Sequence, residues 1–267
     1  ATMAPFPATD PLDVTALAER AHGGDKTAAR LLEEALREHP HTALETAADY
    51  INAGLPGDAM TILDRAVTLA PDPKRIDPLV HYYRAHVAEA QGDAGKAKDF
   101  RRAAQAVSLD YAFPFQAEAI PVLERAMAVD ARDASAPYLL GNLLFDDQPD
   151  RAVALWEKAV HLRPDFAMAL RNLALAHSHR GTKEAFEHAI ALLERAVATG
   201  HSTPVHFFEL DQLYEGAGTP VEKRLAMMES HRDAVLARDD ATVSYAGLLT
   251  FTGKNDEAIE LLRQRTF

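Results

Sequence analysis

Small and bulky apolar residues recur along the chain at fixed offsets. Between residues 40 and 71 the recurring positions are Ala47, Tyr50, Gly54, Ala59, Leu63, Ala66 and Pro71. Between residues 239 and 262 the same offsets return with Ala246, Leu249, Gly253, Ala258 and Leu262. A helical apolar period that is interrupted by Gly and ended by Pro predicts a helix, a turn and a second helix.

Four further segments carry the same spacing in whole or in part. They are marked by Gly23, Ala28, Leu32, Ala35 and Pro40; by Ala85, Ala88, Gly92, Ala97 and Ala104; by Gly141, Ala152, Trp156, Ala159 and Pro164; and by Leu173, Ala174, Ala189, Leu193 and Ala196. Self-similarity at a period of about 20 to 50 residues indicates a repeat architecture rather than a single closed core.

Two segments depart from this pattern. The unit around Asp211 keeps its first helix, but its second helix, near Glu222 to Met228, is degenerate. Only 22 residues separate Ala97 from Ala119, which is too short for a full unit. Residues 116–130 therefore predict a lone second helix, with Pro121 either in its first turn or at a kink.

The segment from Ser108 to Phe115 is apolar for a loop. It is either a packed connector or a loop that reaches into a binding groove, since apolar residues tend to be buried and functional residues favour loops. We place a boundary here, which gives an N-terminal sub-stack at 1–110 and a C-terminal sub-stack at 111–267 of one continuous solenoid.

The offsets resemble the tetratricopeptide repeat, a helix-turn-helix unit of about 34 residues. The resemblance covers nearly the whole chain and implies an all-α, TPR-like α-solenoid (superhelix) of about seven and a half helix-turn-helix repeats. Small residues allow the two helices of a unit to cross closely, bulky residues fill the gaps, and Pro ends the second helix.

A narrower resemblance rests on the order of five segments, "ALREHPHTALETAADY", "PLVHYYRAHVAEAQGD", "APYLLGNLLFDD", "LRNLALA" and "FELDQLY". This order is similar to the C-terminal repeat region of a bacterial family of unknown function, in which a β-rich, carbohydrate-processing-like domain comes first. The resemblance implies an attached hydrolase-like domain whose catalytic residues match no position here. Because the chain begins with Ala1 and ends without a polar capping helix, we expect it to be a piece of a longer protein.

Composition excludes several classes of protein. A formal net charge of −12 disfavours binding to nucleic acids and to anionic membranes. The chain has no cysteine, so disulfides, thiolate zinc sites and cysteine nucleophiles are excluded. No apolar stretch is long enough to span a bilayer, and the start lacks the features of a signal peptide, so we expect a soluble, cytoplasmic protein.

No catalytic motif or cofactor motif is present. The chain lacks a nucleophile elbow, a phosphate-binding glycine loop and a dinucleotide fingerprint. His177 and His179 are two residues apart, and His81 and His86 are five apart, so neither pair has the helical zinc spacing. Paired acids such as Asp146-Asp147 suit helix ends better than catalysis. We therefore expect no metal, no cofactor and no enzymatic activity in this region, and the question stays open for a longer parent protein.

In tetratricopeptide stacks the first helix of each unit lines the concave face. That register implies a groove formed by Tyr82, Tyr83, His86, Tyr138, Asn142, Phe145, Arg171, Asn172, Phe208, Glu209 and Gln212. Aromatic and polar side chains together suit an extended peptide or a sugar. Each aromatic residue has the alternative interpretation that it seals neighbouring helices.

A carboxylate clamp of the kind found in chaperone-binding family members is not expected. Asn142 and Asn172 match its asparagines, but its three cation positions hold Tyr138, Val205 and Glu209, and Glu209 would repel a carboxylate. The sequence thus predicts a non-catalytic interaction or scaffold domain that binds a peptide or a neighbouring domain in its concave groove. The alternative is an accessory domain of a carbohydrate-active enzyme, which frames a glycan or docks the catalytic domain.

Overall fold

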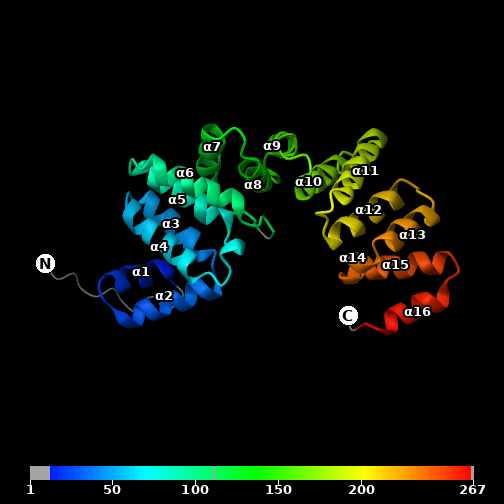
Figure 1. The fold of residues 1–267 in the computed structure, drawn as a ribbon, viewed down its shortest axis with the longest axis horizontal. Helices are drawn as coiled ribbons and strands as arrows, with labels where there is room; N and C mark the ends of the chain where they lie inside the picture. The colour runs from blue at the N-terminus through cyan, green and yellow to red at the C-terminus, as the bar shows by residue number, and fades with distance from the viewer. Residues whose placement is uncertain (1–12, 111, 266–267) are drawn as a thin grey trace. The chain divides into compact units, whose positions relative to one another are not determined.

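The protein is all-α. The computed structural model describes residues 13–110 and 112–265, and within those ranges the secondary structure consists of sixteen α-helices and one short 3₁₀ helix, without a strand (Figure 1). The expected TPR-like succession of helix-turn-helix units is thereby confirmed. The chain divides into two compact units, Ala1–Asp146 and Asp147–Phe267.

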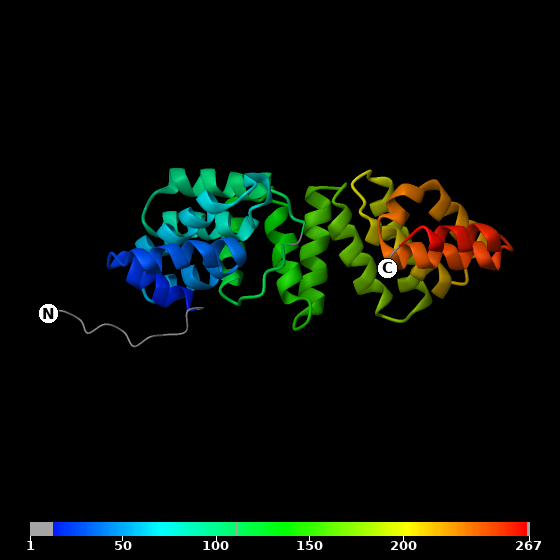
Figure 2. The ribbon, with the colours of Figure 1, turned by 90° about the horizontal axis from the view of Figure 1, so that it is seen from below.

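The first unit is a stack of antiparallel helix pairs followed by two further helices (Figure 2). The first helix of each new pair packs against both helices of the pair before it, as α5 does against α3 and α4. Residue 110, the expected sub-stack boundary, lies inside this unit, and that boundary stays a prediction. The elements are α1 (Val14–His22), α2 (Lys26–Glu38), α3 (Thr42–Asn52), α4 (Pro56–Leu69), η1 (Pro73–Arg75), α5 (Pro78–Ala90), α6 (Ala94–Ala106), α7 (Ala119–Val129) and α8 (Ser135–Leu144).

The second unit follows the same rule. Helix α12 packs against α11, and α15 packs against α12, α13 and α14. A contiguous apolar core, which includes Phe207, Met228, Val235 and Leu249, joins these last helices. The elements are α9 (Pro149–Leu162), α10 (Ala167–Ser178), α11 (Lys183–Ala198), α12 (Pro204–Gly216), α13 (Val221–Ser230), α14 (Arg232–Leu236), α15 (Asp239–Phe251) and α16 (Asn255–Arg263).

Small residues lie where paired helices cross, as the register predicts. They are fully or almost fully buried in both the first and the second helices of the pairs, and include Ala47, Ala85, Ala174, Ala59, Ala97 and Ala189. The turn between the helices uses a glycine in the left-handed region, with φ of 74° at Gly54 and 81° at Gly92. An L side chain is disfavoured there, so glycine lets the chain reverse within a few residues.

The lone helix predicted at residues 116–130 is α7, and Pro121 lies in its first turn. The connector before it is half packed: Ala112 and Pro114 are buried, whereas Phe113 and Phe115 are exposed. Ser108 N–H donates to the carbonyl oxygen of Lys74 at 2.9 Å, which ties the connector to η1. Tyr111 lies outside the described residues.

The degenerate unit carries a buried ion pair between its two helices. Asp211 stands on α12 where other first helices carry Ala or Gly, and its carboxylate is fully buried. Arg224 of α13 donates to it in a bidentate manner, from Nε to Oδ1 at 2.7 Å and from Nη2 to Oδ2 at 2.9 Å. Two matched hydrogen bonds of this kind compensate much of the desolvation of both charges.

Arg224→Met tests this pair. We expect a loss of about 3–5 kcal/mol in the free energy of unfolding, because the change leaves a buried carboxylate without its cation. Chemical denaturation measures the effect. The double variant Asp211→Ala/Arg224→Met restores the small residue and is expected to recover most of the loss; a double variant as unstable as the single one would contradict this account.

His81 on α5 predicts a pH dependence of stability. Burial, with the nearby Arg84 guanidinium, lowers the pKa of His81 from 6.5 to about 4. A base whose pKa falls on folding binds fewer protons when folded, so its contribution is complete above pH 6.5 and is lost as the pH falls toward 4. Between pH 7 and pH 5 the free energy of unfolding is expected to fall by about 2 kcal/mol through this residue.

His81→Gln is expected to reduce the difference in unfolding free energy between pH 7 and pH 5 by that amount. His161→Gln, at an exposed position of α9, is the matched control and should keep the wild-type difference. Equal pH dependence in wild type and His81→Gln would show that His81 does not titrate on unfolding.

Candidate functional site

Three of the predicted groove residues belong to the core. Tyr82 and Tyr83 on α5 and Tyr138 on α8 are each only 1% exposed. Direct contact with a ligand would require these rings to leave the core. As placed, they seal neighbouring helices, which is the alternative that the sequence left open for each aromatic residue.

Tyr82 is part of a buried polar network at the start of α8. Its hydroxyl donates to Oδ2 of Asp133 at 2.8 Å, and Oδ1 of Asp133 accepts the backbone N–H groups of Ser135 and Ala136. Burial raises the pKa of Asp133, and burial together with the Asp133 charge raises the pKa of Tyr82 well above its usual range. This network fixes the entry of α8 against α5.

His86, Asn142 and Phe145 are half-buried members of the predicted set in the first unit. Burial lowers the pKa of His86 on α5. One turn further along α5, Glu89 accepts hydrogen bonds from Arg101 of α6 and Arg125 of α7, and the bonds from Arg125 are the main reason that its pKa is low. The exposed end of α5 is thus polar and braced by ion pairs.

In the second unit, the predicted residues join α10 to α12. Arg171 Nε donates to Oε2 of Glu209 at 2.6 Å, and Arg171 Nη2 makes a second hydrogen bond to Oε1. Asn172 and Phe208 are half-buried, and Gln212 is exposed on α12. Glu209 therefore pairs with a cation of its own chain, in line with the expectation that it does not bind a carboxylate.

His206 makes a second link between α12 and α10. Its ring is fully buried, and the Nε2–H tautomer lets it donate to the carbonyl oxygen of Ala167 at 3.3 Å while Nδ1 accepts the N–H of Thr203 at 3.0 Å. Burial lowers the pKa of His206, so the neutral ring that these bonds need is favoured.

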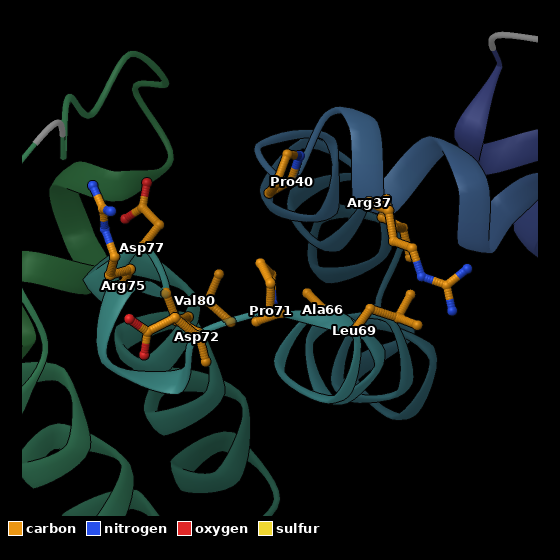
Figure 3. A pocket seen from close by; sticks show the side chains of 12 residues that line it. Arg37, Pro40, Ala66, Leu69, Pro71, Asp72, Arg75, Asp77 and Val80 are labelled. Atoms are coloured by element: carbon orange, nitrogen blue, oxygen red, sulfur yellow. The ribbon is translucent and has the colours of Figure 1, made fainter.

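An open cleft of about 740 Å³ lies in the first unit at one end of its helices (Figure 3). We call it the α2–α5 cleft. Its walls come from the C-terminal ends of α2 and α4, from η1 and from the start of α5. It is lined by Leu36, Arg37, Pro40, Ala66, Leu69, Ala70, Pro71, Asp72, Arg75, Ile76, Asp77 and Val80.

The α2–α5 cleft is apolar inside and charged at its ends. Arg75 and Asp77 lie together at one end, and Arg37 lies at the other (Figure 3). Asp77 caps α5 by accepting the N–H of Leu79 at 2.8 Å, and burial raises the pKa of its carboxyl. Asp72 caps η1 by accepting the N–H of Lys74 at 2.9 Å. Carboxylate oxygens beside an apolar wall can accept N–H groups of a bound chain.

None of the cleft residues was foreseen as a site. The available signal was the segment "PDPKRIDP" at residues 71–78, in which three prolines and four charged residues lengthen the connection between two repeats. This longer connection supplies η1 and the charged residues at one end of the cleft.

Searches for metal clusters and for membrane-spanning helices were limited to residues 13–110 and 112–265. Within it no three His, Asp or Glu side chains are grouped to hold a metal ion. No helix there is both long enough and apolar enough to cross a membrane. The rings of His177 and His188 lie with their centroids 4.4 Å apart at an interplanar angle of 48°, and burial is the main cause of the lowered pKa of His177.

Comparison with known proteins gives no family assignment, because no protein-family model matches the chain. Among solved structures, TTC0263, a thermophilic TPR protein of Thermus thermophilus, is 18% identical with a TM-score of 0.42, and the match covers 79% of this chain and 98% of that chain. PilF of Pseudomonas aeruginosa is 15% identical with a TM-score of 0.45, covering 87% and 91%. MamA is 24% identical with a TM-score of 0.31, covering 73% and 96%.

The two neighbouring tyrosines of α5 give a matched test of the buried network. Tyr82→Phe is expected to lower the free energy of unfolding by about 1–3 kcal/mol, because Asp133 loses a buried donor. Tyr83→Phe removes a buried hydroxyl that no described group accepts, so a change within about 0.5 kcal/mol is expected. Thermal or chemical denaturation measures both. Equal losses in the two variants would show that the Tyr82–Asp133 bond contributes nothing specific.

Proposed function

We propose that this chain is a non-catalytic interaction module that binds an extended segment of a partner protein or of a neighbouring domain. The observation that supports this most directly is the α2–α5 cleft, which combines apolar walls with charged ends. A cleft of this size admits one or two apolar anchor side chains of a peptide, while polar groups at its ends fix the peptide's direction.

The repeat register supports the same proposal. Stacked helix pairs supply a rigid scaffold whose loops and helix ends are free to vary without loss of the core. The cleft lies at such helix ends, and its α4 lining residues, Ala66 and Leu69, follow the buried residues Ile62 and Leu63 by about one to two turns.

The predicted groove residues are a second set of candidates for the same function, taken separately in each unit. His86, Asn142, Phe145, Arg171, Asn172, Phe208, Glu209 and Gln212 keep some exposure, although Arg171 and Glu209 also bind each other. For the alternative glycan-framing role, Phe145 and Phe208 are the aromatic residues of this set that keep exposure for stacking on a sugar ring, because Tyr82, Tyr83 and Tyr138 are buried.

A cleft-filling variant tests the proposal. Dodecamer peptides are first selected from a random phage-displayed library on the wild-type chain, and their dissociation constants are measured by fluorescence anisotropy. Ala66→Phe places a ring in the cleft and is expected to raise these constants about tenfold or more. Thr68→Phe, on the exposed side of α4, is the matched control and should change them less than about twofold.

Two outcomes would contradict the proposal for the α2–α5 cleft. One is a selection that yields no binding peptide. The other is peptide binding that Ala66→Phe leaves intact; if Gln212→Ala or Asn172→Ala weakens that binding instead, the site is the predicted groove.

A further inference from the structure

The charges that line the α2–α5 cleft differ in how far their own chain compensates them. Asp72 and Asp77 each accept a backbone N–H group at the start of a helix, of η1 and α5 respectively. Arg37 stands in the last turn of α2 and pairs with Glu33 at 3.7 Å. The exposed side chain of Arg75 makes no hydrogen bond or ion pair with another residue that the structure describes. Arg75 is therefore the least compensated charge of the lining.

An exposed guanidinium beside an apolar cleft favours a carboxylate as its partner. The planar fork of N–H donors matches the two oxygens of a carboxylate, and such charged hydrogen bonds are about twice as strong as neutral ones. The apolar part of the lining, with Leu36, Ala66, Leu69 and Val80, offers a ligand contact without charge. Charge complementarity therefore points to a segment in which an apolar anchor residue stands near an aspartate or a glutamate.

The connector between α6 and α7 meets the wall of the same cleft at two points. At its start, Ser108 N–H donates to the carbonyl oxygen of Lys74 in η1, which walls the cleft. Near its end, the ring of Phe115 meets the ring of His41 edge to face, with centroids 6.2 Å apart, and His41 directly follows the cleft residue Pro40. The connector therefore follows one side of the cleft.

Exposed rings on this connector extend the apolar surface beyond the cleft. Phe113 is 62% exposed and Phe115 is 54% exposed, although large apolar side chains are usually buried. Ala112 and Pro114, which alternate with them, are buried and hold the connector against the helices. This alternation keeps both rings at the surface, where a chain that leaves the cleft can cover them.

We propose that the occupant of the α2–α5 cleft is an acidic, apolar segment of a partner protein. Its apolar anchor enters the cleft, the side-chain carboxylate of a neighbouring Glu or Asp pairs with Arg75, and the chain continues over Phe113 and Phe115. The carboxylate belongs to a side chain, because a chain that ended at Arg75 would leave the two rings uncovered. This inference rests on the proposed function and specifies the occupant of that site.

Charge reversal at Arg75 tests the carboxylate. Among the dodecamers selected on the wild-type chain, those that Ala66→Phe weakens are expected to carry Asp or Glu more often than the unselected library. Arg75→Glu should raise their dissociation constants about tenfold or more, because it sets like charges against each other. Lys98→Glu makes the same change of charge at an exposed position of α6 and is the matched control, with an expected change below about twofold.

Exchange of the charge on the peptide completes this test. Replacing the peptide's Asp or Glu by Lys should weaken binding to the wild type and restore binding to Arg75→Glu. A misfolded variant cannot produce such a rescue. Amidation of the peptide's C-terminus should change the constants less than about twofold. A larger loss on amidation than on removal of the side-chain carboxylate would overturn the assignment to a side chain.

Phe113→Ala tests the path over the connector. The dissociation constants are expected to rise about threefold to tenfold, because the peptide loses its contact with an aromatic ring. Phe251→Ala, which removes an exposed ring from α15, is the matched control and should leave them unchanged. Unchanged constants in Phe113→Ala would overturn this path.

Failure of this inference differs from failure of the proposed function. Peptides that Ala66→Phe weakens and Arg75→Glu does not would overturn the acidic occupant, while the cleft would stand as a peptide site. Cleft-binding peptides without Asp or Glu would have the same meaning. A selection that yields no binding peptide would overturn both.

Discussion

The structure depends on one steric constraint, the close approach of paired helices at their crossing points. Ala47 and Ala59 in one pair, and Ala174 and Ala189 in another, are fully buried, so nothing larger than a methyl group separates the helices there. Close crossing leaves each pair with two broad faces and little interior of its own. Stability then comes from stacking, and each pair is complete only when its next neighbour covers it.

Polar groups set the relative orientation of the stacked helices. The bond from Tyr82 to Asp133 ties α5 to the connection before α8, and the bonds from Arg171 to Glu209 and from His206 to the carbonyl oxygen of Ala167 join α10 and α12. Apolar faces alone can slide along one another with small changes in buried area. Directional bonds between buried or half-buried groups penalise such sliding, because a displaced partner leaves a polar atom unsatisfied.

The sequence predicted the structural features that depend on interactions between residues close together in the chain. The turn glycines, the buried alanines and the lone helix α7 were predictable, because φ preference and helical periodicity act within a few residues. The role of Tyr82 was not, because its register position faces both the groove and the next helix, and only the neighbour's packing decides between them. The Asp211–Arg224 pair and the α2–α5 cleft depend on residues from different elements meeting in space, which no spacing rule encodes.

The bond between Ser108 and Lys74 links two connections that lie far apart in the sequence. Lys74 belongs to η1, which walls the α2–α5 cleft, and Ser108 begins the connector that carries the exposed rings of Phe113 and Phe115. An occupant that shifts η1 therefore pulls on that connector as well. That one backbone bond holds a wall of the cleft and the start of the aromatic connector together, so neither loop is positioned independently of the other.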